Sequence, residues 1–151
     1  MEQYQLEAAE CYMKVMRMSK QAAHRFFLAE GVHPGQAMAL HVVSCAEETP
    51  PTQKEIAREL QVSAPTIASC IRRLEESGCI VRAADEEDGR CNRILLIEQG
   101  KMLSARCNRG VETIMETMME GFSAEESRQL KGYLERMAEN ISRLNGPEEE
   151  E

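Results

Sequence analysis

Small, hydroxylic and basic side chains gather on one side of the helix predicted from Ser63 to the glycine at position 78. They are Ser63, Pro65, Thr66, Ser69, Arg72 and Arg73. The other side carries Ile67, Ile71 and Leu74 at helical spacing, which suits it to packing. Guanidinium groups donate to phosphate oxygens and guanine edges, and small side chains allow close approach to a groove. The pattern favours a helix that packs by its apolar side and meets DNA with the other; a packing unit with solvated arginines is the alternative.

Two further arginines fall in a predicted β-hairpin. Residues 79–83 and 92–98 read as strands, and the acidic loop between them ends in Asp-Gly, a turn signal. Arg90 and Arg93 follow that turn, where guanidinium groups can lie along a phosphate backbone or enter a narrow minor groove. A helix, a three-residue turn, a second helix and this hairpin together describe a winged helix-turn-helix.

The cysteines are the second group of chemically capable residues. They are scattered, with no C-x-x-C pair, and lie at Cys11, Cys45, Cys70, Cys79, Cys91 and Cys107. We expect reduced thiols packed as small apolar side chains, because a redox sensor needs a stabilised thiolate open to oxidant. Cys11 has acidic Glu7 and Glu10 nearby, so we expect it to be buried and structural. Oxidation of Cys70 or Cys91 would weaken DNA contact directly, and Cys91 is expected to be the more exposed of the two.

The sequence gives little support for a metal-binding site or an enzyme active site. His24, His33 and His41 form no His-x-x-x-His pair, and zinc needs three or four ligands around one point. The sequence also has no phosphate-binding glycine loop and no nucleophile elbow. We therefore predict no metal, no cofactor and no enzymatic activity.

Charge and composition limit which partners and which cellular location we expect for the protein. The 151 residues carry a formal charge of −8, which argues at first against nucleic acid. Residues 52–101 hold 8 basic and 9 acidic side chains, so the remaining −7 lies in the flanks, partly in a C-terminal PEEEE run. No apolar run approaches membrane-spanning length, and no secretory signal pattern opens the chain, so we expect a cytoplasmic protein.

Long helices flank the predicted DNA-binding array. Apolar stripes predict helices over residues 5–29, 34–45, 102–122 and 123–144. The fold class is mainly α with a small β-hairpin wing. We expect an N-terminal dimerisation helix (1–33), a winged helix-turn-helix domain (34–100), C-terminal dimerisation helices (101–145) and an acidic tail (146–151), intertwined as one domain overall.

The array resembles the MarR (multiple antibiotic resistance regulator) family of bacterial transcription factors. The resemblance rests on IAREL-VS--TI---IRRLEESG-IVR and on the wing motif Asp88-Gly89-Arg90 followed by a strand and Gly100. It implies a homodimer that binds a palindromic operator in double-stranded DNA through two winged domains. Arg90 would be the wing arginine, oriented by Asp88. The family commonly has Leu-Thr before this glycine where the chain has Leu96-Ile97, which puts the start of the next helix in doubt.

The resemblance also bears on the signal that such a regulator senses. Members are usually repressors released by a small molecule, a metal or an oxidant. Cys11 resembles in position the reactive thiol of the branch that senses organic hydroperoxides. A small-molecule pocket would be lined by Met13, Met16, Phe26, Phe27 and Met38, although the same stripe also suits a core.

Two functions thus remain open. The favoured one is a sequence-specific DNA-binding regulator, most simply a repressor. Its rival is a winged-helix protein-interaction module that does not bind DNA, which the overall negative charge and the acidic wing loop keep in play.

Overall fold

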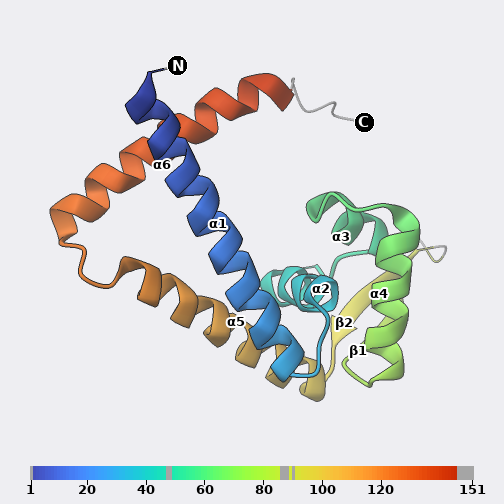
Figure 1. Cartoon of the computed structure of the whole chain (residues 1–151). Helices are drawn as coiled ribbons and strands as arrows, with labels where there is room; N and C mark the ends of the chain where they lie inside the picture. Colours follow the sequence, from blue (N-terminus) through green and yellow to red (C-terminus); the bar gives the residue numbers. More distant parts are fainter. Residues whose placement is uncertain (1, 47–48, 86–88, 90, 146–151) are drawn as a thin grey trace. The chain divides into compact units, whose positions relative to one another are not determined.

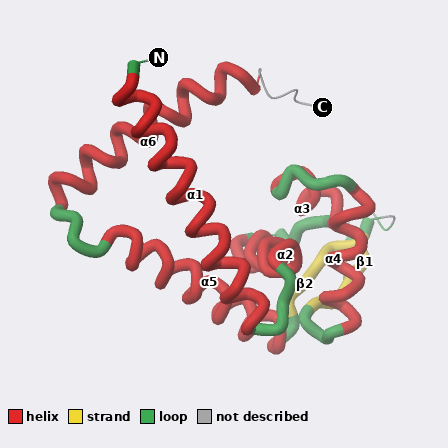
Figure 2. The backbone as a smooth tube through the Cα atoms, in the orientation of Figure 1, coloured by secondary structure: helices red, strands yellow, loops and turns green. Residues whose placement is uncertain are grey.

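A computed structural model of the chain describes residues 2–46, 49–85, 89 and 91–145. They form helices and one hairpin in the order α1 (Gln3–Ala29), α2 (Pro34–Cys45), α3 (Gln53–Glu59), α4 (Ala64–Glu76), β1 (Ile80–Ala84), β2 (Asn92–Leu96), α5 (Glu98–Met119) and α6 (Ala124–Asn145) (Figures 1 and 2). The predicted fold class, mainly helical with a two-stranded wing, is confirmed. The chain divides into two compact units, residues 1–114 and 115–151, and each is described by itself.

Local capping chemistry places α3 and α4 where the sequence predicts them. Thr52 caps α3: its backbone N–H donates to Glu55 Oε2 at 2.7 Å, and the Glu55 N–H donates to Thr52 Oγ1 at 3.2 Å. Ser63 caps α4, where its Oγ accepts from the Thr66 N–H at 3.4 Å. Each cap satisfies backbone donors that the first turn of a helix leaves unpaired. Gly78 ends α4 with φ of 69°, in the left-handed region that favours glycine.

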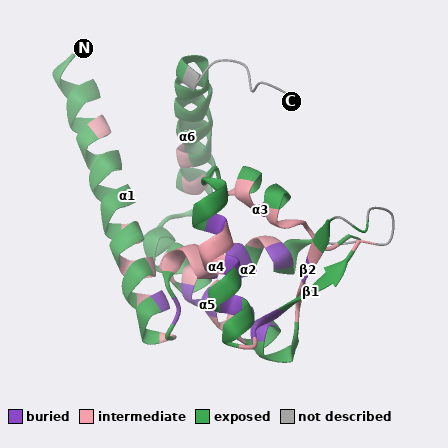
Figure 3. Cartoon of the chain, turned by 90° about the vertical axis from the view of Figure 1, so that its right-hand side faces the viewer, coloured by how far each residue is buried: buried purple, intermediate pink, exposed green. Residues whose placement is uncertain are grey.

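The main core lies where α2, α3 and α4 meet the hairpin (Figure 3). The apolar side of α4 supplies Ile67, Ile71 and Leu74, each at most 1% exposed. Ile56 of α3 and Ile94 of β2 pack in the same cluster. Because burial of such a side chain stabilises a fold by about 1.5–3 kcal/mol, this cluster holds the opposite side of α4 toward solvent.

A second, smaller cluster joins the end of α1 to α5. Phe27 and Cys107 are buried there, and Phe26 packs against them. Arg106 of α5 donates to Glu30 at 2.7 Å. The rest of the predicted α1 stripe differs from expectation: Leu6, Met13 and Met16 are 46–59% exposed. The periodicity predicted the helix correctly, but the described chain provides no cover for this part of its apolar side.

The junction between β2 and α5 is held by a close backbone approach at Gly100. The second strand ends at Leu96 rather than residue 98, because α5 begins at Glu98. The helix forms without a threonine cap: the Lys101 N–H donates to the Ile97 carbonyl at 3.0 Å, and the Ile97 N–H donates to the Cys79 carbonyl at 3.1 Å. A Cβ at Gly100 would lie 1.9 Å from the Cys79 carbonyl oxygen, so only glycine fits.

We therefore expect Gly100→Ala to lower the free energy of unfolding by about 3 kcal/mol, because the backbone of residue 79 must move to admit the methyl group. Urea unfolding followed by circular dichroism measures the change. Gly132→Ala is the matched control: it lies within α6 with no atom within 4 Å of the added Cβ, and it should leave stability unchanged or raise it by up to about 1 kcal/mol. Equal effects of the two substitutions would contradict the close-approach argument.

Candidate DNA interface

The turn between α3 and α4 presents the polar side of α4. Gln61 adopts φ of 51°, the one positive φ among the non-glycine residues that the structure describes. The Val62 N–H donates to the Ala57 carbonyl at 3.0 Å, which closes the turn. Such a turn lets α4 cross α3 while both bury their apolar sides in the same core.

The predicted DNA-facing residues of α4 lie together on its open side. Ser63, Pro65, Thr66, Arg72 and Arg73 are exposed, and Ser69 is partly buried. The Ser63 and Thr66 hydroxyls lie 2.8 Å apart at the start of the helix. The Arg72 Nε is 3.9 Å from Glu76 Oε1, and both side chains are about two-thirds exposed, so this ion pair is weak. A phosphate oxygen can replace Glu76 as the partner of Arg72 at little cost.

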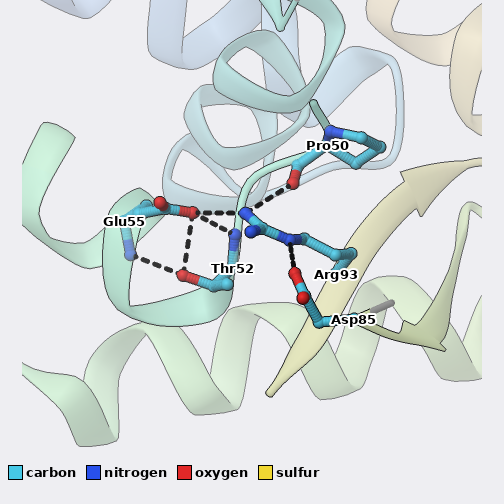
Figure 4. Close-up of polar contacts among 5 residues, drawn as sticks. All are labelled: Pro50, Thr52, Glu55, Asp85 and Arg93. Atoms are coloured by element: carbon cyan, nitrogen blue, oxygen red, sulfur yellow. Dashed lines mark hydrogen bonds and ion pairs between the residues drawn. The ribbon is translucent and has the colours of Figure 1, made fainter. Parts of the chain in front are cut away.

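Arg93 of β2 forms a network that we call the wing anchor: Arg93, Asp85, Glu55, Thr52 and Pro50 (Figure 4). The Arg93 Nε donates to Asp85, and one terminal nitrogen donates to the Pro50 carbonyl and to Glu55 Oε2, each at 3.2 Å. Glu55 also accepts from the backbone N–H and the hydroxyl of Thr52. A single guanidinium thus joins the wing, the segment before α3 and the first turn of α3.

The wing anchor changes the interpretation of Arg93. The sequence predicted a DNA contact, but the side chain is only 25% exposed and its donors are directed at protein acceptors. Arg82 of β1 is tied in a similar way, to Glu75 of α4 at 3.1 Å and to Gln53 of α3 at 3.2 Å. Sequence reasoning missed Asp85, Arg82 and this second role of Glu55. The predicted wing residues Asp88 and Arg90 lie outside the described residues.

Hydrogen bonding sets the charge states within the wing anchor. The backbone N–H of Thr52 lowers the pKa of Glu55 below its ordinary value, and the Thr52 hydroxyl and Arg93 act in the same direction. The hydrogen bond to Asp85 raises the pKa of the Arg93 guanidinium. Both groups are therefore held in their charged forms, which strengthens the hydrogen bonds between them.

The cysteines divide by burial. Cys79 and Cys107 are buried, Cys70 is partly buried, and Cys11, Cys45 and Cys91 are exposed. Burial raises the pKa of the Cys70 and Cys107 thiols, which disfavours their thiolates. The expectation for Cys91 is confirmed. The expectation that Cys11 is buried is wrong, because its side chain is exposed in the part of the chain that the structure describes.

Four of the five predicted pocket residues line one open groove between α1 and α2, with a volume of about 870 Å³. They are Met13, Met16, Phe27 and Met38. Phe26 does not line the groove; it packs instead near Gly110 of α5, where an added Cβ would come within 2.5 Å of its ring. Lys20 and His24 lie on the groove's polar rim.

The described part of the chain shows no grouping of three or more His, Cys, Asp or Glu residues suited to a metal ion. His33 instead caps α2, where its Nδ1 accepts from the Gly35 N–H at 3.2 Å. Across the described residues no helix is long and apolar enough to cross a membrane.

Comparison with known proteins shows which proteins the helix-turn-helix and its wing resemble. The MarR family model matches residues 30–90. An HTH-type transcriptional regulator of Bacillus subtilis, YdgJ, is 25% identical over 91% of this chain and 83% of its own length. The Staphylococcus aureus MepR–DNA complex contains a chain that is 25% identical and superposes with a TM-score of 0.75, covering 87% of this chain and 96% of MepR. The MarR family regulator SP03579 has the same fold, with a TM-score of 0.84 at 21% identity over 95% of this chain and 94% of its own.

The match to the MarR family model covers residues 30–90, and the described chain has the winged helix-turn-helix fold of MarR-family regulators. These matches favour the DNA-binding regulator over the protein-interaction module that the sequence left open. α3 and α4 form its helix-turn-helix, and β1 and β2 form its wing.

The charge states of the wing anchor predict a pH dependence. Since the pKa of Glu55 is lowered on folding, its carboxylate stabilises the fold above its unfolded pKa, and this contribution is lost as the pH falls through the folded pKa. Glu55→Gln should lower stability near pH 7, and the difference from the native protein should shrink between about pH 5 and pH 3. Urea titrations across this range measure it. Glu59→Gln, on the same helix but outside the wing anchor, controls for the loss of one charge. A difference for Glu55→Gln that does not vary with pH would refute the prediction.

Proposed function

We propose that this protein is a MarR-type homodimeric repressor that binds a palindromic operator and is released by a small-molecule or oxidant signal. The observation that carries the proposal is the two-sided character of α4: an apolar side buried in the core, and an exposed side with hydroxyls and arginines. The occurrence of a MepR chain of similar fold in a complex with DNA supports it.

In this proposal α4 enters the major groove. Ser63, Pro65, Thr66 and Ser69 are small enough to let the helix backbone approach the bases. Arg72 and Arg73 donate to phosphates or guanine edges near the end of the helix. Their near-neutral surroundings make the contact local, so the overall charge of −8 does not prevent it.

The wing supplies a second contact. Arg90, oriented by Asp88, reaches the backbone or the minor groove beside the site of α4. Arg93 has a positioning role: through Asp85 and Glu55 it sets where the wing stands relative to α3. Arg93 thereby acts on DNA through the wing rather than by direct contact.

Dimerisation would cover the apolar stripes that the single chain leaves open. Leu6 and Val15 of α1 are exposed, and so are Leu134, Met137 and Ile141 of α6. Continuous apolar stripes on long helices pack against other helices, and a second copy of the chain offers the same stripes. Residues 1–33 and 101–145 would form this interface, and residues 34–100 the DNA-binding domain.

The groove lined by Met13, Met16, Phe27 and Met38 is the proposed site for a small-molecule effector. Its walls are apolar and deformable because methionine adapts its shape to a ligand. The groove lies between α1, part of the proposed dimer interface, and α2, part of the DNA-binding domain. A ligand there would change the spacing of the two copies of α4.

Binding to a palindrome tests the proposal directly. A shift assay should show two protomers on one palindrome with half-sites about one helical turn apart. Arg72→Ala should weaken binding by about 1–3 kcal/mol and reduce the slope of log affinity against log salt by about 0.9 if it removes one phosphate contact. Arg128→Ala is the matched control, because it removes an equally exposed arginine of α6 that pairs with Glu125 at 2.7 Å. Equal losses from the two variants would reject α4 as the DNA-contacting helix.

The positioning role of Arg93 is tested through its acidic partner. Asp85→Asn removes a negative charge, so simple electrostatics predicts tighter DNA binding. If the ion pair positions the wing, the same variant binds DNA several-fold more weakly, and the β2 amides exchange hydrogen faster. Glu76→Gln controls for charge, since it removes a carboxylate beside Arg72 without touching the wing anchor. Tighter binding by both variants would show that Arg93 does not position the wing.

A further inference from the structure

One arginine of the hairpin contacts both helices of the helix-turn-helix. The Arg82 Nε donates to Glu75 Oε2 at 3.1 Å, and one of its terminal nitrogens donates to Gln53 Oε1 at 3.2 Å. Glu75 lies in the last turn of α4, and Gln53 is the first residue of α3. We call these three residues the helix bridge. The helix bridge shares no residue with the wing anchor, which has no member in α4.

The strand β1 holds the bridging arginine in a fixed place. Arg82 pairs with Ile94 of β2 in the hairpin register, and Ile94 is fully buried. Ile80 lies two residues before Arg82 and is 1% exposed, so the two side chains leave the same face of the strand toward the helices. The guanidinium therefore extends from a base that the core already holds, and 31% of the side chain is exposed.

The helix bridge closes the end of the helix pair that the turn leaves open. At one end α3 and α4 are joined by the chain itself, where Gln61 and Val62 form the turn. Gln53 and Glu75 lie at the other end, and Arg82 joins them. Among the contacts of the described residues, this bond to Glu75 is the one side-chain hydrogen bond that links α4 to another helix or strand. The two helices are thus tied at both ends.

Apolar packing and the helix bridge restrain different motions of α4. Ile67, Ile71 and Leu74 resist rotation of the helix about its own axis, because rotation would expose them. Apolar contacts have no preferred direction, so they resist a small tilt of the axis less well. The 13 residues of α4 are about 20 Å long, and a tilt of roughly 10° at the turn would move the far end by about 3 Å. One planar guanidinium could not then hold both of its partners.

We propose that Arg82 is a positioning residue that sets the angle between α3 and α4 and thereby the sequence specificity of DNA binding. This role rests on the proposed contact of α4 with the major groove. Hydrogen bonds to base edges need donors and acceptors in exact positions, whereas attraction to phosphates tolerates small shifts. A changed angle at α4 therefore weakens binding to the operator more than binding to unrelated DNA.

Two other roles of Arg82 would have different consequences. A purely structural ion pair would affect stability and the fraction of active protein, and so would lower binding to every DNA alike. A half-exposed pair of this kind contributes little to stability. A direct phosphate contact would make binding less dependent on salt when Arg82 is replaced, and it would not involve Glu75.

Glu75→Ala tests the positioning role in the full-length protein. The measured quantity is the ratio of affinities for a palindrome that the native protein selects from random duplexes and for a scrambled duplex of the same composition. Loss of a carboxylate favours binding to any DNA by simple electrostatics, so the scrambled duplex should bind at least as tightly as before. The ratio should nevertheless fall about fivefold or more, which is comparable to the effect of one mismatched base pair.

Glu76→Ala is the matched control. It removes the same charge from the same turn of α4, but its carboxylate pairs with Arg72 within the helix and not with β1. This variant should not lower the ratio. Equal ratios in Glu75→Ala and the native protein, or an equal fall in both glutamate variants, would overturn the positioning role.

Arg82 itself is tested by removal and by exchange. Arg82→Met keeps the apolar stem and removes the guanidinium, so it should lower the ratio as Glu75→Ala does and leave the slope of log affinity against log salt unchanged. The exchanged pair, Arg82→Glu with Glu75→Arg, restores an ion pair whose carboxylate can accept from the Gln53 amide. It should recover most of the lost ratio. A slope reduced by about 0.9 in Arg82→Met, or an exchanged pair without recovery, would overturn the proposal.

Hydrogen exchange separates failure of this proposal from failure of the proposed function. Without DNA, the amides in the last turn of α4 should exchange faster in Glu75→Ala and Arg82→Met than in the native protein or Glu76→Ala. Unchanged exchange would overturn the helix bridge. If the native protein selects no palindrome, the proposed function is rejected, and the exchange rates still decide whether Arg82 holds α4.

Discussion

The arrangement of the helix-turn-helix and its wing depends on the forked hydrogen bonding of Arg93. Its guanidinium donates in several directions within one plane, so it holds Asp85, Pro50 and Glu55 at the same time. A lysine ammonium is a compact point charge without this planar fork, and it cannot impose the same geometry. A two-stranded hairpin alone is only marginally stable, so a wing needs contacts of this kind to keep one position beside the helices. The side chain that the sequence assigned to DNA therefore acts first on the protein.

The orientation of α4 is set in another way, because one side of the helix is apolar and buried and the other side is polar and exposed. Ile67, Ile71 and Leu74 are buried so completely that rotation of the helix about its axis would expose apolar area and open cavities. That constraint fixes where Ser63 and Arg72 point without any polar contact to hold them. The weak pair between Arg72 and Glu76 is consistent with this division, because a strong internal partner would compete with phosphate. The wing is thus positioned by polar contacts, and the rotation of α4 about its axis by apolar packing.

The features predicted correctly from the sequence are those encoded within a few residues. The capping box of Thr52 and Glu55, the Ser63 cap and the left-handed Gly78 all involve neighbours in the chain. The helix after Ile97 formed without the expected threonine because packing of Gly100 against the Cys79 carbonyl determines its start.

The contacts that the sequence did not reveal join distant segments. Arg93 and Glu55 are 38 residues apart, and His41 and Asn108 are 67 apart, so no spacing rule links them. The predicted burial of Cys11 failed for a different reason: acidic neighbours argue against a stabilised thiolate, but they do not show whether the side chain is covered.

The segment between α2 and α3 links the end of α2 to the wing. Cys45 is the last residue of α2, and residues 50–52 provide the acceptor for Arg93, the acceptor for Ile94 and the cap of α3. The same short stretch therefore connects the end of α2 to the wing anchor. A ligand or partner that binds more tightly when the wing anchor is open must, by linkage, favour the open state to the extent of that difference in affinity.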